Sequence, residues 1–191
     1  MTGARPTLED LPDSELLALA QQGPQARPAF GQLTRRHQAW LVRLLYFLLH
    51  SQAEAEDVAQ EALVRAFLAI RDFRGESSFR GWLRVVATRL AFNRRREART
   101  RRHRTDELVP IAPANGGARL EQRQLIEHVL SRLSYPYREI LVLRYVEELP
   151  IAEIARMLEL GESATKMRLS RAREQFQAAF GQLSTNGKTD E

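Results

Sequence analysis

The segment from Phe73 to Arg104 constrains this chain more than any other, because it joins an apolar helical stripe to a dense run of arginines. Residues 71–104 carry twelve arginines against three acidic residues, a net charge of +9, although the whole 191-residue chain carries only +5. The positive charge is therefore local. Local basicity of this kind favours a polyanionic partner such as nucleic acid.

Spacing within this segment predicts a helix from about Phe79 with two unlike faces. One face carries the apolar residues Phe79, Trp82, Val86 and Leu90. The opposite face is expected to carry Arg80, Arg84, Thr88, Ala91 and Arg95. One side can then be buried while the other meets phosphates. Phe79 and Trp82 at this spacing also fit an ordinary core stripe, and an arginine-rich helix end also fits a solvated face.

A short loop is expected just before this helix. Gly75, Glu76, Ser77 and Ser78 are poor helix formers and lie between two phenylalanines. Aromatic rings beside cations are suited to binding unstacked bases. The loop is therefore a candidate site for single-stranded nucleic acid.

The composition excludes several functional classes. There is no cysteine, and the four histidines lack ligand spacing, so we expect no metal or cofactor site. The N-terminus has no apolar export segment, and the longest apolar run, residues 41–49, is interrupted by Arg43. We therefore expect a cytoplasmic protein without membrane insertion.

The first seventy residues predict three helices: a short one from Asp13 or Ser14, a strongly buried one over 28–50, and one that begins at the capping-box spacing of Ser51 and Glu54. The last of these is expected to expose a polar face with Asp57, Gln60, Glu61 and Arg65. Paired carboxylates can serve a phosphotransfer enzyme, but no third metal ligand and no phosphate-binding glycine loop accompany them. A partner-binding face is the better interpretation, and no catalytic residue is assigned.

A linker rich in proline and glycine is predicted over 101–120, between a first domain over 1–100 and a second over 121–191. The second domain predicts a helix over 120–133, another ending near Glu148, a short helix from Pro150, and a last helix over 164–180. The expected fold class is therefore all-α, with two small helical domains.

The short helix, the turn at Gly161 and the longer basic helix have the pattern of a helix-turn-helix. The inward positions of the last helix are expected to be Thr165, Leu169, Ala172 and Phe176. Positions that remain free to read base edges are Lys166, Met167, Ser170 and Arg171. Arg168 and Arg173 flank them as candidate phosphate contacts.

Together these motifs resemble the extracytoplasmic-function sigma factors. The resemblance spans nearly the whole chain and rests on Asp57–Ala62, Phe73–Leu83, Tyr137–Tyr145, Glu153–Ala155 and Arg168–Arg173. It implies a sigma-two domain that binds the beta-prime clamp helices of core RNA polymerase and melts the minus-ten element. It also implies a sigma-four domain on the beta flap that reads the minus-thirty-five duplex, and an anti-sigma factor as a further partner.

The resemblance also assigns residues to these roles. The clamp-facing residues would be Asp57, Gln60, Glu61 and Arg65. The minus-ten contacts would be Gly75, Ser77, Ser78, Phe79, Arg80, Arg84, Thr88, Arg89 and Asn93. Family base readers stand where this chain has Lys166, Met167, Ser170 and Arg171, the four positions that periodicity selects.

The chain departs from the family pattern at two places, with Pro150 where a serine or threonine usually starts the first helix of the helix-turn-helix, and Glu159 where the turn usually has glycine. One alternative is a helix-turn-helix regulator that binds duplex DNA without polymerase. That reading leaves the Asp57 and Glu61 face and the aromatic-flanked loop unexplained.

Overall fold

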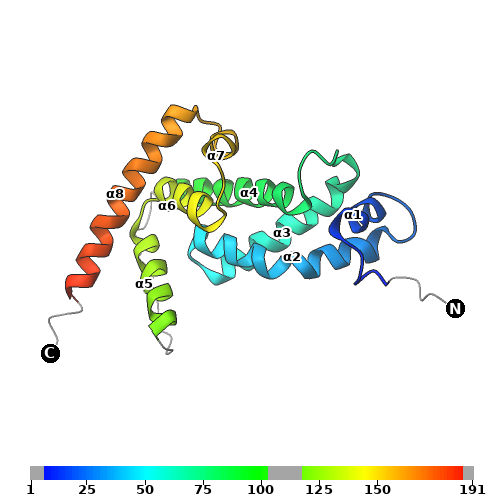
Figure 1. Cartoon of the computed structure of the whole chain (residues 1–191), viewed down its shortest axis with the longest axis horizontal. Coiled ribbons are helices and arrows are strands. Elements are labelled where there is room, and N and C mark those ends of the chain that lie inside the picture. Colours follow the sequence, from blue (N-terminus) through cyan, green and yellow to red (C-terminus); the bar gives the residue numbers. More distant parts are fainter. Residues whose placement is uncertain (1–6, 103–117, 187–191) are drawn as a thin grey trace. The chain divides into compact units, whose positions relative to one another are not determined.

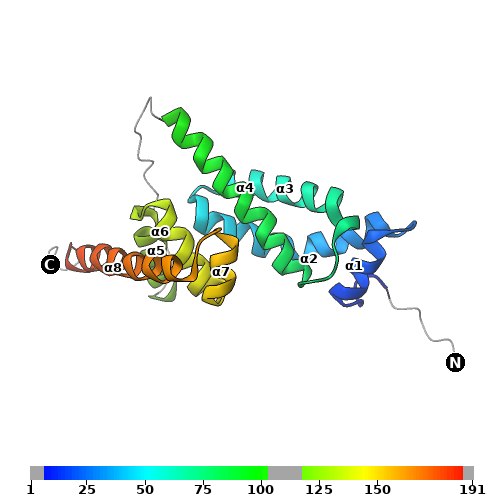
Figure 2. The same cartoon turned by 90° about the horizontal axis from the view of Figure 1, so that it is seen from above.

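The computed structural model describes residues 7–102 and 118–186, and every regular element in these two ranges is a helix. The chain divides into two compact units, residues 1–101 and 102–191 (Figures 1 and 2). The prediction of an all-α protein with two small domains is confirmed. The central part of the predicted linker, residues 103–117, lies outside the described residues. No helix in the described ranges is long and apolar enough to cross a membrane.

Unit 1 is built around one long helix, with the other elements packed on it. Its described elements are α1 (Asp13–Gln21), α2 (Ala26–Leu49), α3 (Gln52–Ala69), the 3-10 turn η1 (Ile70–Asp72) and α4 (Phe79–Arg102). Both α1 and α3 lie against α2. Helix α4 reaches α2 through the ring pair of Phe30 and Phe79, whose centroids are 6.1 Å apart.

Local sequence explains where these helices begin and pack. The Ser51 hydroxyl accepts the backbone N–H of Glu54 at 3.3 Å, so Ser51 caps α3 as predicted. Three alanines of α3, at positions 55, 59 and 62, are buried. Small side chains at a helix contact let the two axes approach closely. Large leucines of α2, such as Leu33 and Leu45, are fully buried and fill the core.

Unit 2 is a second helical bundle. Its described elements are α5 (Ala118–Arg132), α6 (Tyr135–Leu141), the π-helical turn η2 (Val142–Val146), α7 (Ile151–Met157) and α8 (Glu162–Asn186). Helices α5, α6 and α7 all contact α8. Fully buried residues from four of these elements form the core, including Val129, Ile140, Leu143 and Ala172.

A buried arginine ties α5 to α6 in this unit. Arg138 is buried, and its guanidinium donates to the backbone carbonyls of Leu130 at 2.9 Å, Ser131 at 3.0 Å and Leu133 at 3.2 Å. Carbonyls at a helix C-terminus lack partners within the helix and carry partial negative charge. Arg138 therefore satisfies the end of α5 and fixes the angle at which α6 follows it.

Candidate nucleic-acid and partner interfaces

The predicted partner-binding face of α3 contains an ion-pair network that reaches α4. Arg94 of α4 lies 2.8 Å from an oxygen of Asp57 and 3.3 Å from an oxygen of Glu61. The other Glu61 oxygen accepts from Arg65 at 2.6 Å. Three of the four predicted residues are thus brought together, and Arg94 joins them. These side chains are at least one-third exposed, so a partner can compete for the two carboxylates.

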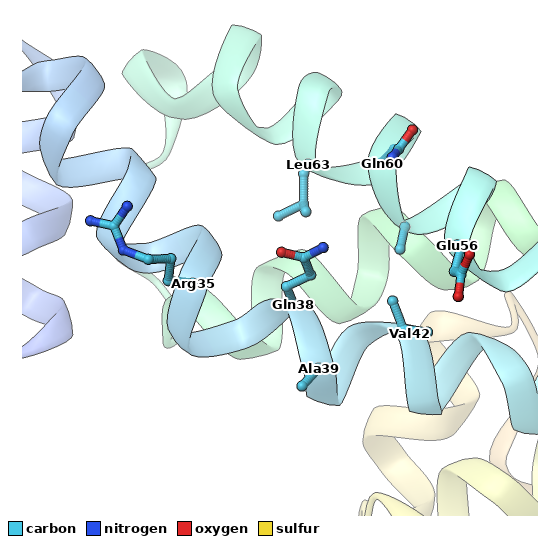
Figure 3. Close-up of a pocket in the computed structure, with 8 residues that line it drawn as sticks. Arg35, Gln38, Ala39, Val42, Glu56, Gln60 and Leu63 are labelled. Carbon is cyan, nitrogen blue, oxygen red and sulfur yellow. The ribbon is translucent and has the colours of Figure 1, made fainter.

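Gln60 lies on the other flank of α3. It lines a groove of about 430 Å³ between α2 and α3, together with residues that include Gln38, Val42 and Glu56 (Figure 3). Helical geometry explains the difference. Asp57 and Glu61 are four residues apart and lie on the side of α3 nearer α4, whereas Gln60 lies on the side nearer α2. The predicted single polar face therefore spans the whole exposed width of the helix.

Two aliphatic side chains occupy the exposed face of α3, a feature that sequence reasoning missed. Val64 is 58% exposed and Leu68 is 74% exposed. Their spacing of four residues, opposite the buried alanine stripe, is the sequence signal that could have revealed them. An apolar centre beside charged groups is typical of a protein-binding surface.

The loop between η1 and α4 is exposed, as predicted. Gly75 has φ +74°, a left-handed conformation that glycine adopts without strain. The Ser78 hydroxyl accepts the backbone N–H of Gly81 at 3.1 Å and so caps α4. Arg80 places its guanidinium carbon 4.4 Å above the Trp40 ring, a cation–π contact at the base of the loop.

Phe79 is a core residue, as its place on the apolar stripe predicts, although the family resemblance also assigned it to the minus-ten contacts. It is 2% exposed and lies among the rings of Phe30, His37 and Trp82 at centroid distances of 5.3 to 6.1 Å. Phe73 is also buried and lies 5.0 Å from Trp82. The two phenylalanines anchor the ends of the loop, and neither presents a free ring face for a base.

The prediction of an exposed face on α4 is wrong in part. Arg84 is 9% exposed, Thr88 is 3% exposed and Ala91 is fully buried. Helix α4 lies against both α2 and α3. The buried part of its surface is therefore wider than the single stripe formed by its large apolar residues. Of the predicted contacts on α4, Arg80, Arg89 and Asn93 are exposed.

An aromatic ring accompanies Arg89 and Asn93 on the exposed face of α4. Phe92 is 48% exposed between them, and Arg96 follows one turn later and is exposed. Sequence reasoning had not selected either residue. The exposed face of α4 thus has cations, an amide and an aromatic ring, a combination typical of surfaces that bind single-stranded nucleic acid.

Helix α8 has the two faces that its sequence predicts. Of the four predicted inward positions, Thr165, Leu169 and Ala172 are buried, whereas Phe176 is half-buried and stacks on Phe180 with ring centroids 6.2 Å apart. On the other side Lys166, Met167 and Arg171 are exposed, Ser170 is half-buried and donates to Glu174 at 3.3 Å, Arg168 is half-buried and Arg173 is exposed. The start of α8 lies beside the turn that follows α7 (Figure 1). This part of α8 therefore presents a cationic surface, as a recognition helix does.

Both departures from the family pattern have a structural counterpart. Glu159 has φ +54°, the left-handed conformation for which glycine is favoured. The turn thus has the backbone geometry typical of glycine although glutamate occupies the position. The left-handed conformation costs a glutamate about 1 kcal/mol. Pro150 precedes α7 as its N-cap and makes no side-chain capping bond. The first helix of the motif therefore lacks the hydroxyl cap that serine or threonine supplies.

Glu139 is an ionisable residue in the core of unit 2. It lies on α6 and is 2% exposed. Burial raises its pKa to about 7, and a hydrogen bond from Tyr135 at 3.4 Å and the positive charge of Arg168 offset that effect only in part. Because the folded protein binds this proton more tightly than the unfolded chain, the contribution of Glu139 is most favourable below pH 4.5 and is lost as the pH rises through 7.

Unit 2 is therefore expected to lose about 2 to 3 kcal/mol of its free energy of unfolding between pH 5 and pH 8. Glu139→Gln should remove most of this dependence, since glutamine has no proton to lose. Hydrogen exchange of core amides such as that of Ile140 measures the effect at each pH. Trp40 and Trp82 are the only tryptophans of the chain, and both lie in unit 1, so their fluorescence is an internal control. An equal pH dependence in the variant would contradict the assignment.

Comparison with known families supports the sequence resemblance. The model of Sigma-70 region 2 matches residues 33–101, and the model of Sigma-70 region 4 matches residues 123–176. ECF RNA polymerase sigma factor SigM of Mycobacterium tuberculosis is 32% identical over 174 residues, which cover 91% of this chain and 87% of SigM. The ECF RNA polymerase sigma-E factor of Escherichia coli K12 is 30% identical, with coverage of 87% and 93%.

Solved structures with a similar fold also exist. The chain resembles CnrH, solved in complex with the cytosolic domain of CnrY, at 29% identity and a TM-score of 0.60, covering 87% of this chain and 95% of CnrH. It also resembles the sigma factor RpoE of Bartonella quintana, solved with the anti-sigma factor NepR, at 23% identity and a TM-score of 0.66, covering 85% and 98%. The second likeness is one of fold. Among the described residues, no cluster of histidine and acidic side chains is able to hold a metal ion.

Proposed function

Because this chain belongs to the sigma-70 family of RNA polymerase sigma factors, in its extracytoplasmic-function group, we propose that its two units divide the recognition of a promoter between them. Unit 1 binds core polymerase and the melted minus-ten strand, and unit 2 binds the minus-thirty-five duplex. The observation that carries the proposal is that each unit matches a different sigma region and exposes its own cationic helix. The protein acts by binding, without chemistry of its own, in the cytoplasm.

The polymerase-binding surface is the exposed face of α3. Asp57 and Glu61 supply negative charge, and Val64 and Leu68 supply an apolar centre. By family resemblance the receiving element is the pair of clamp helices of beta-prime. Arg94 holds the two carboxylates until basic groups of the partner compete for them. Gln60 and Arg65 lie at the two margins of this surface.

The minus-ten surface is the loop together with the exposed face of α4. Gly75, Ser77 and Ser78 form the loop part, Arg80 lies beside them in the first turn of α4, and Arg89 and Asn93 lie further along α4. Phe92 also belongs to this surface, because an exposed aromatic ring between cations can stack on an unpaired base. Phe79, Arg84 and Thr88 are buried in this structure, so they support the surface from beneath and are removed from the set of direct contacts.

The minus-thirty-five surface is the start of α8. Lys166 and Arg171 carry cationic groups that can reach base edges in the major groove. Met167 and Ser170 lie beside them, and Arg168 and Arg173 are placed for phosphates. The beta flap is the proposed polymerase contact of unit 2. A regulator that acts without polymerase is not favoured, because relatives named as sigma factors match both units.

An anti-sigma factor is the proposed regulatory partner. The similar RpoE structure contains the anti-sigma factor NepR, and the similar CnrH structure contains the cytosolic domain of CnrY. The exposed aliphatic pair of α3 is the surface that such a partner would have to cover to prevent binding of core polymerase.

The proposed division of labour is tested by separating duplex binding from strand opening. Lys166→Ala and Arg171→Ala should each cost about 1–3 kcal/mol of binding to a minus-thirty-five duplex selected by the holoenzyme, and much less on a scrambled duplex. Arg173→Ala should weaken both duplexes similarly and reduce the salt slope by about one, since it contacts phosphate. None of the three should impair transcription from a template whose minus-ten region is already mismatched and whose polymerase is held upstream by other means.

The measurements are titrations of duplex at several salt concentrations and run-off transcription with core enzyme on the pre-opened template. Equal losses for Lys166→Ala on selected and scrambled duplex would remove Lys166 from the base-reading set. Absence of transcription by the wild-type chain with core enzyme would overturn the proposal as a whole.

A further inference from the structure

Helix α1 makes a contact with the minus-ten loop that neither the sequence nor the family comparisons assign. The side-chain amide of Gln21, the last residue of α1, donates to the Phe73 carbonyl at 2.6 Å and to the Ile70 carbonyl at 3.3 Å. Both acceptors are carbonyl oxygens, so the NH₂ end of the amide must face them. The contact joins segments that are about fifty residues apart in the chain. Figures 1 and 2 show α1 beside the junction between α3 and α4.

The position of Gln21 is itself fixed by the rest of α1. Leu16 and Ala20 are buried against the core. At the other end of the helix, Asp13 pairs with Arg36 at 2.9 Å and with His37 at 2.5 Å, both on α2. Helix α1 is thus held on α2 at both ends. A side chain at its C-terminus can therefore act as a rigid support.

Both ends of the loop are anchored, and Gln21 supplies one of the anchors. At the far end Ser78 caps α4 through the N–H of Gly81, and the adjacent Phe79 is buried. At the near end the Phe73 carbonyl is the last backbone group before the exposed residues 74–78. Glycine has more accessible backbone conformations than other residues, so ordering a loop that contains it costs conformational entropy, and anchored ends reduce that cost.

We propose that Gln21 is a positioning residue for minus-ten recognition: it holds the start of the loop so that residues 74–80 are pre-organised for the unpaired strand. The proposal rests on the proposed function of the loop. Gln21 does not touch DNA, because its amide is half-buried and occupied by the two carbonyls. Its effect is to lower the cost of ordering the loop when a base binds.

The chain contains a matched pair of variants to test this. Gln21→Met keeps the length of the side chain and removes its donors. Gln22→Met makes the same chemical change at the next residue, which is exposed. The probe is a single-stranded non-template oligonucleotide selected from a random pool by core polymerase carrying the wild-type chain, together with a copy that is abasic at the most strongly selected position.

Gln21→Met in the holoenzyme is expected to weaken binding of the selected strand about tenfold, which corresponds to the loss of two hydrogen bonds. Binding of the abasic copy should change much less, so that discrimination falls, and exchange of the Phe73 amide should become faster in the free chain. Gln22→Met should resemble wild type in every measurement. Affinity for core polymerase reports on the fold of unit 1 and should be unchanged in both variants.

The outcomes separate this inference from the proposed function. Arg80→Met removes a loop charge and tests whether the loop binds the strand at all. If Arg80→Met weakens strand binding and Gln21→Met does not, the positioning role of Gln21 is wrong and the loop function stands. If neither variant has an effect, the proposed loop function itself is wrong. Equal losses on the selected and abasic strands, or a parallel loss of core binding, would make Gln21 a general stabilising residue and overturn the inference.

Discussion

Replacement of Arg138 by methionine is expected to remove on the order of 4 kcal/mol from the free energy of unfolding of unit 2. The guanidinium makes three hydrogen bonds to the carbonyls of Leu130, Ser131 and Leu133. Hydrogen bonds to charged groups contribute about 1.5–3 kcal/mol each, and a buried carbonyl without a donor adds a further penalty. Methionine fills similar space and supplies no donor.

The consequence for function is expected to be selective. Domains of this kind have a total stability of about 5–15 kcal/mol, so a loss of this size leaves unit 2 unfolded in a large fraction of molecules or easily unfolded by mild denaturant. Binding to the minus-thirty-five duplex should weaken accordingly, while binding of unit 1 to core polymerase remains. Urea unfolding followed by hydrogen exchange at Val129 and Ile140 measures the stability directly.

The matched control is Arg132→Met. Arg132 is the last residue of α5 and is exposed, so its replacement removes a positive charge near the same helix end and little else. We expect a change of less than about 1 kcal/mol, from the helix dipole alone. Similar urea midpoints for Arg138→Met and Arg132→Met would show that the three carbonyl contacts do not hold α5 in place.

Charge reversal at Asp57 and Glu61 is expected to abolish binding to core polymerase, with a loss of at least about 100-fold in affinity. Like charges brought together at an interface cost several kcal/mol, and the double change Asp57→Arg with Glu61→Arg replaces two negative charges by two positive ones. The fold should survive, because the ion pairs that are lost are partly exposed and exposed pairs contribute only about 0–1 kcal/mol each.

Arg94→Gln distinguishes the effect of the negative charges from the effect of the ion pairs that they make. It removes the same ion pairs to Asp57 and Glu61 and leaves both negative charges in place. Binding to core polymerase should therefore be kept or strengthened in this variant. Copurification and titration with labelled core enzyme measure both variants, and circular dichroism checks the fold. A loss for Arg94→Gln as large as that for the double reversal would mean that the ion-pair geometry, and not the negative charge, is recognised.

The comparison of sequence and structure is most favourable for α8. Of the four positions expected to face inward, Thr165, Leu169 and Ala172 are buried and Phe176 is half-buried. The helix packs with one side only against α5, α6 and α7, so the buried arc is narrow and coincides with the apolar positions. Periodicity is a sufficient guide in such a case.

Helix α4 is the contrasting case. Its large apolar residues predicted one buried stripe, but Arg84, Thr88 and Ala91 are buried as well. Alanine and threonine are only weakly hydrophobic and arginine is polar. Hydrophobic periodicity therefore does not predict that these three positions are buried. Phe79 lies on the buried stripe as predicted, but the rings that surround it, Phe30 and His37, belong to α2, and spacing within α4 does not identify them.

The sequence by itself therefore determined the helical fold class, the concentration of positive charge, the family and the exposed cationic face of α8, because each depends on composition or on spacing within one segment. Only the tertiary structure decided which flank of α3 meets α4, which arginines of α4 are covered, and that Gln21 reaches the start of the loop. These depend on contacts between residues tens of positions apart. Such contacts are set by how whole helices pack, and helical spacing within a segment contains no information about them.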